Sequence, residues 1–293
     1  FLDGMRRFYF TYRKGFATIT PSFYTSDMGW GCTYRTCQMM LAESFSRVLL
    51  GRFWDPFRLT SAQQARHARI VEWFHDSADS SAYYSIHNMS RVATYMDKRI
   101  GDWLGPSIGA HVMLRISRMH HKCPLAIHVA LDQEVFTKEV RETAFGGPAR
   151  GPNGWKPLLL LVPVRLGFER VDPKYTEKIK TLFQIPQTVG LVGGKPSRSY
   201  YFIGRQGDNL FFLDPHVTRN FSDSSDFESL GIADTDEYHT THICTIGINK
   251  LDPSMLIGFL FNTEAEWESF AQAATDKDSS RAICTGATPL FTL

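Results

Sequence analysis

The chain has 293 residues, of which 43% are hydrophobic and 21% charged, and its formal net charge is +2. That length and apolar content indicate a folded protein with a sizeable core, and no apolar run is long enough to cross a bilayer. The balanced charge gives no basic field for nucleic acid, so we expect neither a nucleic-acid partner nor a transmembrane segment.

The first half of the chain is predicted to be mostly helical. Apolar residues recur at helical spacing after Cys32, and Gly51 is placed to end that helix. Two further helical patterns run over residues 61–74 and 86–100. A fourth helical pattern begins at Ser107, which has the polar side chain of an N-cap.

The second half changes to the patterns of strands and turns. A Gly207-Asp208-Asn209 turn between two apolar runs predicts a β-hairpin over residues 200–214. The other predicted elements are strands at 124–132, 157–166, 242–251 and 255–261 and a closing helix at 263–274. This order predicts a single α+β domain over residues 1–293, with helices first and an antiparallel or mixed sheet after them. A small extra lobe near residues 55–105 fits the pattern without being required by it.

Five cysteines are spread widely over the chain, at Cys32, Cys37, Cys123, Cys244 and Cys284. Their odd number and wide spacing argue against a disulfide framework and favour a reducing compartment, so we expect a cytoplasmic protein. Cys32 and Cys37 lack the second close pair that a zinc site needs. We therefore predict no metal site and no cofactor.

A Gly-Gly-Lys run within residues 189–197 matches a phosphate-binding loop only in part. The first glycine of that motif would fall at Val189, and Pro196 stands where the motif has serine or threonine. We therefore predict a mobile glycine loop beside the hairpin and no nucleotide site.

Cys32 lies where the strongest helical pattern starts, directly after Gly29-Trp30-Gly31. A thiol at a helix N-terminus feels the partial positive charge of unpaired N–H groups, which favours the thiolate. The two glycines would let a substrate approach the backbone closely, with N–H groups near a developing oxyanion. These residues fit a nucleophilic cysteine, and they also fit a buried cysteine that follows a tight turn.

A catalytic thiolate needs a base, and His216 is the histidine of the chain that stands out for this role. It ends the predicted hairpin as Leu-Asp-Pro-His, two residues after Asp214. Residues i and i+2 of an extended segment share a face, so the carboxylate and the imidazole can stand side by side. A strand that ends in a turn would show the same pattern. Together with Cys32, however, these residues predict a Cys-His-Asp set.

Six stretches of the chain carry a resemblance to a known family. They are FTYRKGF (10–16), TSDMGWGCTYRTCQMMLA (25–42), GDWLGPS (101–107), VGGKPSRSYYFIG (192–204), LDPHVTR (213–219) and LDPSMLIGF (251–259). Together they resemble the autophagins, papain-like cysteine peptidases that process the autophagy ubiquitin-like modifier. The resemblance implies a papain-like fold with a small extra lobe. It also implies two reactions on a GABARAP-like modifier: cleavage after a glycine near its C-terminus, and release of that glycine from phosphatidylethanolamine at a transiently visited membrane.

The resemblance also implies roles for individual residues. Cys32 matches the nucleophile, His216 the general base, Asp214 the residue that orients it, and Tyr12 a tyrosine whose hydroxyl lines the oxyanion hole. That role of Tyr12 is consistent with Ser26, which stands where papain has its oxyanion-hole glutamine. The substrate-binding residues implied are a tryptophan over the active site and a gating loop, at Trp103 and at Gly193, Gly194, Lys195 and Pro196.

Two other functions remain open from the sequence. Peptidases of the ubiquitin-fold modifier share features of GWGCTYRT and LDPH, although they are less similar to FTYRKGF and LDPSMLIGF. An inactive relative that only binds the modifier is the second alternative, and the intact Cys32, Asp214 and His216 argue against it. A short motif, Phe227 and Leu230 among acidic residues, is a further expected docking point for the modifier.

Overall fold

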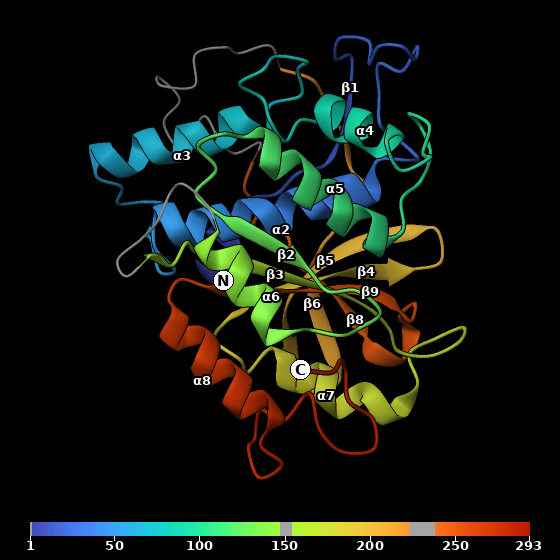
Figure 1. The fold of residues 1–293 in the computed structure, drawn as a ribbon. Coiled ribbons are helices and arrows are strands. Elements are labelled where there is room, and N and C mark those ends of the chain that lie inside the picture. The colour runs from blue at the N-terminus through green and yellow to red at the C-terminus, as the bar shows by residue number, and fades with distance from the viewer. Residues whose placement is uncertain (1, 147–153, 223–237) are drawn as a thin grey trace.

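The computed structural model describes residues 2–146, 154–222 and 238–293 (Figure 1). A seven-stranded mixed sheet forms its centre, in the strand order β2-β3-β9-β4-β5-β6-β8. The pair β2–β3 is parallel and the other pairs are antiparallel. The remaining two strands, β1 and β7, form a separate parallel pair. The predicted α+β class is therefore confirmed.

Among the described residues, most helices lie in the first half of the chain and most strands in the second. The helices are α1 (Leu2–Met5), α2 (Cys32–Leu49), α3 (Ser61–Phe74), α4 (Ile86–Thr94), α5 (Pro106–Met119), α6 (Thr137–Phe145), α7 (Thr176–Leu182) and α8 (Glu264–Thr275). The strands are β1 (Tyr12–Lys14), β2 (Ala126–Val129), β3 (Leu158–Arg165), β4 (Thr188–Lys195), β5 (Arg198–Gln206), β6 (Asn209–Leu213), β7 (Thr218–Asn220), β8 (Cys244–Gly247) and β9 (Ser254–Phe261).

Helices cover both faces of the large sheet and create two apolar cores (Figure 1). Side chains of α2 to α5 fill the first core, and side chains of α6, α7 and α8 fill the second. Strand β3 serves both cores, because Leu159 and Leu161 point into the first and Leu158 and Leu160 into the second. A strand buried on both faces needs a continuous apolar run, which is what the sequence has here.

Several predicted elements agree closely with the structure. Helix α3 has the predicted bounds, and Thr60 caps it through a reciprocal pair of hydrogen bonds with Gln63. The predicted hairpin is β5 and β6, joined at Gly207 and Asp208. The predicted strands at 157–166 and 255–261 appear as β3 and β9, and the closing helix appears as α8. The strands predicted at 124–132 and 242–251 are present as β2 and β8, but each is only four residues long.

Two predicted helices have different bounds in the structure. The helical pattern over 86–100 stops at Thr94, and Asp97 has a left-handed backbone with φ of 57° that a helix cannot continue through. Helix α5 starts at Pro106 and not at Ser107, so Ser107 is not the N-cap; Gly105 is, and it offers no side-chain hydrogen bond. Proline suits the first turn because its missing N–H would have no partner there.

The prediction of a mobile glycine loop at residues 189–197 is wrong. Most of this segment is strand β4, paired with β9 on one side and with β5 on the other. A Cβ on Gly194 would lie 2.0 Å from the carbonyl oxygen of Arg198, so the glycine permits close strand approach. Helices α6 and α7 are further elements that the sequence analysis did not predict.

The segment near residues 55–105, the predicted extra lobe, contains α3 and α4. Buried side chains of both helices belong to the same apolar core as Phe45 of α2. The division of the chain into a domain and a lobe stays a prediction.

Candidate active site

Cys32 is the first residue of α2, at the helix end that the sequence predicted. The helix has no capping side chain and no acidic residue in its first turn. The partial positive charge of its first N–H groups is therefore not offset within that turn, and it stabilises a thiolate at Cys32. Burial by itself would raise the pKa of the Cys32 thiol. Interactions with the His216 imidazole, the Ser199 backbone and the Tyr12 hydroxyl outweigh burial, and the pKa is lowered. Cys32 therefore has the environment of a reactive thiolate.

Asp214 and His216 stand side by side just after β6, as predicted. Asp214 Oδ1 accepts hydrogen bonds from His216 Nδ1 at 2.5 Å and from the His216 backbone N at 3.0 Å. A carboxylate can only accept, so Nδ1 carries a proton and Nε2 is the atom left for chemistry. Nε2 is buried without a hydrogen-bond partner among the described residues, and the imidazole interacts electrostatically with the Cys32 thiol.

The charges of this pair reinforce each other. Burial lowers the pKa of His216, but the hydrogen bond that it donates to Asp214 and the interaction with Cys32 raise the pKa to about 9. Burial would raise the pKa of Asp214, and the His216 imidazole instead holds it below its usual value. The three groups therefore favour a thiolate beside an imidazolium near neutral pH.

Tyr12 reaches this site through the parallel pairing of β1 with β7. The Tyr12 backbone N donates to the Pro215 carbonyl at 2.9 Å, and the two rings of Tyr12 and His216 meet edge to face at 5.4 Å. Burial raises the pKa of Tyr12, and the interaction with Cys32 raises it further, so the hydroxyl keeps its proton as a donor. The same hydroxyl also interacts with the backbone of Gly29. Nothing in the local sequence of β1 pointed to this role; only the family resemblance did.

A buried ion cluster beneath Cys32 was missed by the sequence analysis. Arg35, on α2, contacts Asp27 at 2.8 Å and Asp76 at 2.9 Å, and all three side chains are shielded from solvent. Asp27 also accepts the backbone N–H of Arg13 at 2.7 Å, and its own carbonyl accepts those of Trp30 and Gly31. The cluster therefore fastens the turn before Cys32 to the strand that carries Tyr12.

The two glycines before Cys32 are required for different reasons. Gly29 has φ of 87°, a left-handed conformation that glycine adopts without strain, and a Cβ there would meet no atom within 4 Å. Gly31 has an ordinary φ of −80°, but a Cβ there would lie 2.2 Å from Asp27 Oδ2. The first glycine shapes the turn, and the second makes room for the ion cluster.

A cleft of about 290 Å³ runs beside the site and is lined by Trp103 and the end of β4. Thr33 and Ser199, which flank Cys32, also line it, together with Gly193, Gly194 and Lys195. Trp103 is 46% exposed, so it is not a core residue. Pro196, the last residue of the expected gating loop, lies in the two-residue turn between β4 and β5 instead of lining the cleft.

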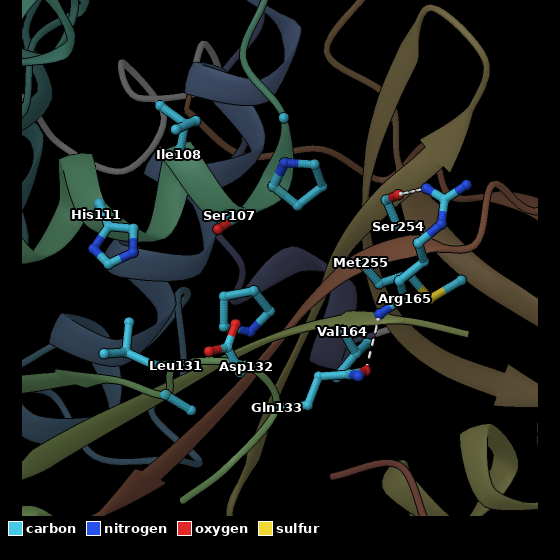
Figure 2. Close-up of a pocket in the computed structure, with 14 residues that line it drawn as sticks. Ser107, Ile108, His111, Leu131, Asp132, Gln133, Val164, Arg165, Ser254 and Met255 are labelled. Carbon is cyan, nitrogen blue, oxygen red and sulfur yellow. Dashed lines mark hydrogen bonds between the residues drawn. The ribbon is translucent and has the colours of Figure 1, made fainter. Parts of the chain in front are cut away.

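A second cavity of about 540 Å³ continues from this cleft, since both are lined by Gly105, Pro106 and Ser254. Figure 2 shows it between the start of α5, which contributes Ser107, and the end of β3 with the start of β9. Arg165 spans one wall, where its guanidinium donates to Ser254 Oγ at 3.0 Å. The two cavities therefore adjoin, and the cleft comes close to Cys32 through Thr33 and Ser199.

Two tyrosines that the sequence analysis gave no role support the catalytic pair. The Tyr9 hydroxyl donates to the Asp214 carbonyl at 2.7 Å, and the Tyr200 ring contacts the His216 ring edge to face at 5.7 Å. Phe227 and Leu230, the expected docking motif, lie outside the described residues. The described part of the chain contains no cluster of metal-binding side chains and no helix long and apolar enough to span a membrane.

A thiol at an uncapped helix start, next to an imidazole held by a carboxylate, is the arrangement that cysteine peptidases use. Residues 2–273 match the family described as "Peptidase C54 catalytic domain". The chain therefore belongs to the C54 peptidases, the autophagins, and its fold is papain-like. The family resemblance of the sequence is confirmed.

Individual relatives agree with this assignment. The chain is 36% identical to cysteine protease ATG4A of Bos taurus over 292 residues, which cover 92% of this chain and 72% of the relative. It is 34% identical to cysteine protease ATG4B of Gallus gallus over 319 residues, covering 100% and 79%. It is 35% identical to cysteine protease ATG4A of Homo sapiens over 306 residues, covering 95% and 75%. The predicted class, a hydrolase of the cysteine peptidase type, follows from this family.

Proposed function

We propose that the protein cleaves a GABARAP-like autophagy modifier after its C-terminal glycine and also releases that glycine from phosphatidylethanolamine. The observation that carries the proposal is the hydrogen bond between Asp214 and His216, together with the interaction of that imidazole with the Cys32 thiol. The presence of Cys32, His216 and Asp214 together also argues against an inactive binding protein, because binding alone would need none of these three side chains.

In this mechanism the Cys32 thiolate attacks the carbonyl carbon of the modifier's glycine, and the carbonyl oxygen takes up the negative charge. The Tyr12 hydroxyl donates to that oxygen. The C–N bond then breaks, and the His216 imidazolium gives its proton to the leaving amine. This amine is the next residue's nitrogen in a precursor and the ethanolamine nitrogen in the lipid conjugate.

The thioester that remains is opened by water. His216, now neutral, takes a proton from the water as its oxygen attacks the carbonyl carbon, and the Cys32 thiolate leaves. Asp214 keeps Nε2 directed at the thiol by holding the proton on Nδ1, and it stabilises the imidazolium in both steps. The products are the modifier with a free carboxyl group and the restored ion pair.

The cleft beside Cys32 supports a substrate tail that ends in glycine. Trp103 forms one wall and the strand end at Gly193 and Gly194 another, so an extended chain fits where side chains are absent. Upstream residues of the modifier would continue into the second cavity (Figure 2). We also propose a cytoplasmic location with transient membrane contact, because Cys32 is a nucleophile only while reduced.

The proposal is tested by covalent labelling with a modifier that carries an electrophile in place of the scissile bond. It should label Cys32, and Cys32→Ala should abolish both labelling and turnover while still binding the modifier. Cys37 provides the matched control, because it lies further along the same helix and its burial raises the pKa strongly. Labelling of Cys37, or cleavage by the Cys32→Ala variant, would remove the proposed nucleophile.

A comparison of substrates separates this function from its nearest alternative. The autophagy modifier and the ubiquitin-fold modifier, each with a C-terminal extension, should be offered to the same enzyme. We expect the autophagy modifier to be cleaved. Preference for the ubiquitin-fold modifier would overturn the substrate assignment and leave the Cys-His-Asp mechanism standing.

A further inference from the structure

The loop between β1 and α2, residues 15–31, exposes three large apolar side chains that are close in the sequence. Phe23 is 97% exposed, Met28 63% and Tyr24 43%. Single exposed apolar residues are common on protein surfaces, but three large ones within six residues of one loop require an explanation. Asp27 is the loop's only charged residue, and it is completely buried. The exposed surface of the β1–α2 loop is therefore free of charge, and its large exposed side chains are apolar.

The β1–α2 loop is firmly attached to the body of the protein. Gly15 N donates to the Thr25 carbonyl at 2.8 Å, which closes the loop at its base. The Ala17 carbonyl lies 2.6 Å from His87 Nε2 on α4. In Figure 1 the loop is the blue segment that projects beyond α4, beside β1. An apolar tip on a held loop keeps its position relative to the rest of the enzyme.

The same loop is directly connected to the reactive thiol. The Tyr24 ring lies 5.5 Å from the Trp30 ring, and Trp30 precedes Cys32 by two residues. Met28 belongs to the turn that leads into α2. Whatever surface the loop touches is therefore held at a set distance from the Cys32 thiol.

The next step rests on the proposed function. In the lipid conjugate, two carbon atoms separate the scissile nitrogen from the lipid phosphate. When Cys32 attacks, the headgroup must therefore lie within a few bond lengths of a thiol that is only 2% exposed. The cleft at Trp103 holds the modifier's tail, so the lipid must approach from another side. The protein surface around that side has to touch the bilayer.

We propose that the β1–α2 loop is a membrane-interface anchor, in which Phe23 and Met28 insert among the headgroups of the bilayer that carries the conjugate. Aromatic and thioether side chains partition into the interfacial layer, and the absence of exposed charge on the loop removes the main cost of entry. Two inserted side chains give weak and reversible binding, which suits an enzyme that must leave after each turnover. The anchor therefore acts on the lipid-linked substrate and not on a soluble precursor.

The test compares two double variants on two substrates. Phe23→Ser with Met28→Ser removes the anchor. Phe53→Ser with Phe57→Ser removes two side chains of similar exposure, 75% and 64%, beyond the far end of α2. Helix α2 has 18 residues and is therefore about 27 Å long, so the control residues follow the end of the helix that lies opposite Cys32. The substrates are the C-terminally extended modifier in solution and the modifier conjugated to vesicles of phosphatidylethanolamine and phosphatidylcholine.

We expect the anchor variant to cleave the soluble precursor at the wild-type rate and to release the vesicle-bound modifier roughly tenfold more slowly. The control variant should match the wild type on both substrates. Unchanged release by the anchor variant would overturn the proposal. Equal slowing on both substrates would also overturn it, because the loop would then contact the modifier.

A second measurement examines the anchor without any substrate. Tryptophan at position 23, as Phe23→Trp, should shift its fluorescence to shorter wavelength when the same vesicles are added, and Phe53→Trp should not. No shift at position 23 would overturn the anchor. Failure of the wild type to release the conjugate would instead overturn the lipid-release part of the proposed function, so the two failures are distinguishable.

Discussion

Replacing Gly31 by alanine should destabilise the turn before Cys32 through lack of space alone. The backbone at Gly31 suits any residue, but the new Cβ would lie 2.2 Å from Asp27 Oδ2 and 2.8 Å from its Cγ. Asp27 cannot move aside freely, because its two oxygens receive hydrogen bonds from Arg35 at 2.8 and 3.0 Å. The backbone N–H of Arg13 holds the same carboxylate.

The expected loss of unfolding free energy depends on which groups the new methyl group displaces. An extra methyl group in a close-packed site costs about 1–3 kcal/mol of unfolding free energy. Displacing Asp27 would leave Arg35 buried with one carboxylate, and breaking a buried pair costs on the order of 3–5 kcal/mol. Asp76 still pairs with Arg35, so we expect a total loss of about 3–5 kcal/mol for Gly31→Ala. Gly29→Ala meets no atom and should cost only about 1–2 kcal/mol, for its left-handed backbone.

Urea unfolding followed by tryptophan fluorescence measures both changes, with the alkylation rate of Cys32 recorded on the folded variants. Gly31→Ala should lower the unfolding free energy more than Gly29→Ala. A smaller or equal loss for Gly31→Ala would show that Asp27 moves without cost, and would refute the reasoning from the ion cluster.

Three further outcomes are expected. Tyr12→Phe should lower kcat by roughly 100-fold or more with little change in KM, because it removes one oxyanion donor and keeps the ring; a change in KM alone would make Tyr12 a wall residue. The raised pKa of His216 keeps the imidazolium until about pH 9, so kcat/KM should fall as pH rises through that value. Asp214→Asn removes the group that contributes most to raising this pKa and should move the fall to lower pH; an unmoved profile would place the orienting group elsewhere. Trp103→Ala should permit cleavage of a modifier whose terminal glycine is alanine, with little loss of stability, since Trp103 is half exposed; unchanged selectivity would exclude Trp103 as the wall.

The features predicted well from sequence are those that depend on neighbouring residues. The start of helix α3 is marked by Thr60 and Gln63, which form a capping box within four residues. The pair Asp214 and His216 follows from alternation along one extended segment, and Cys32 from the start of a periodic pattern. Each of these signals is contained within a few residues, so no knowledge of the fold was needed.

The features that the sequence missed depend on distant partners. Strand β4 is rich in glycine, and only the close approach of β5 and β9 explains why a strand forms there. Tyr12 belongs to a strand of three residues whose partner lies far along the chain, at β7. The cluster of Asp27, Arg35 and Asp76 joins a turn, a helix and a loop, and no spacing in the sequence reveals it.

The order of strands has a consequence for how the protein is made. Among the described strands β9 comes last in the chain, yet it lies between β3 and β4 in the middle of the sheet. Strand β9 joins the pair β2–β3 to the group β4, β5, β6 and β8. Until residues 254–261 have been synthesised, these two parts of the sheet cannot pair through it. Helix α2 with Cys32 packs on β4 and β5, and His216 follows β6, so the reactive groups wait for that central strand. A nascent chain that has not yet reached residues 254–261 therefore carries no finished protease, and activity requires the synthesis of this late strand.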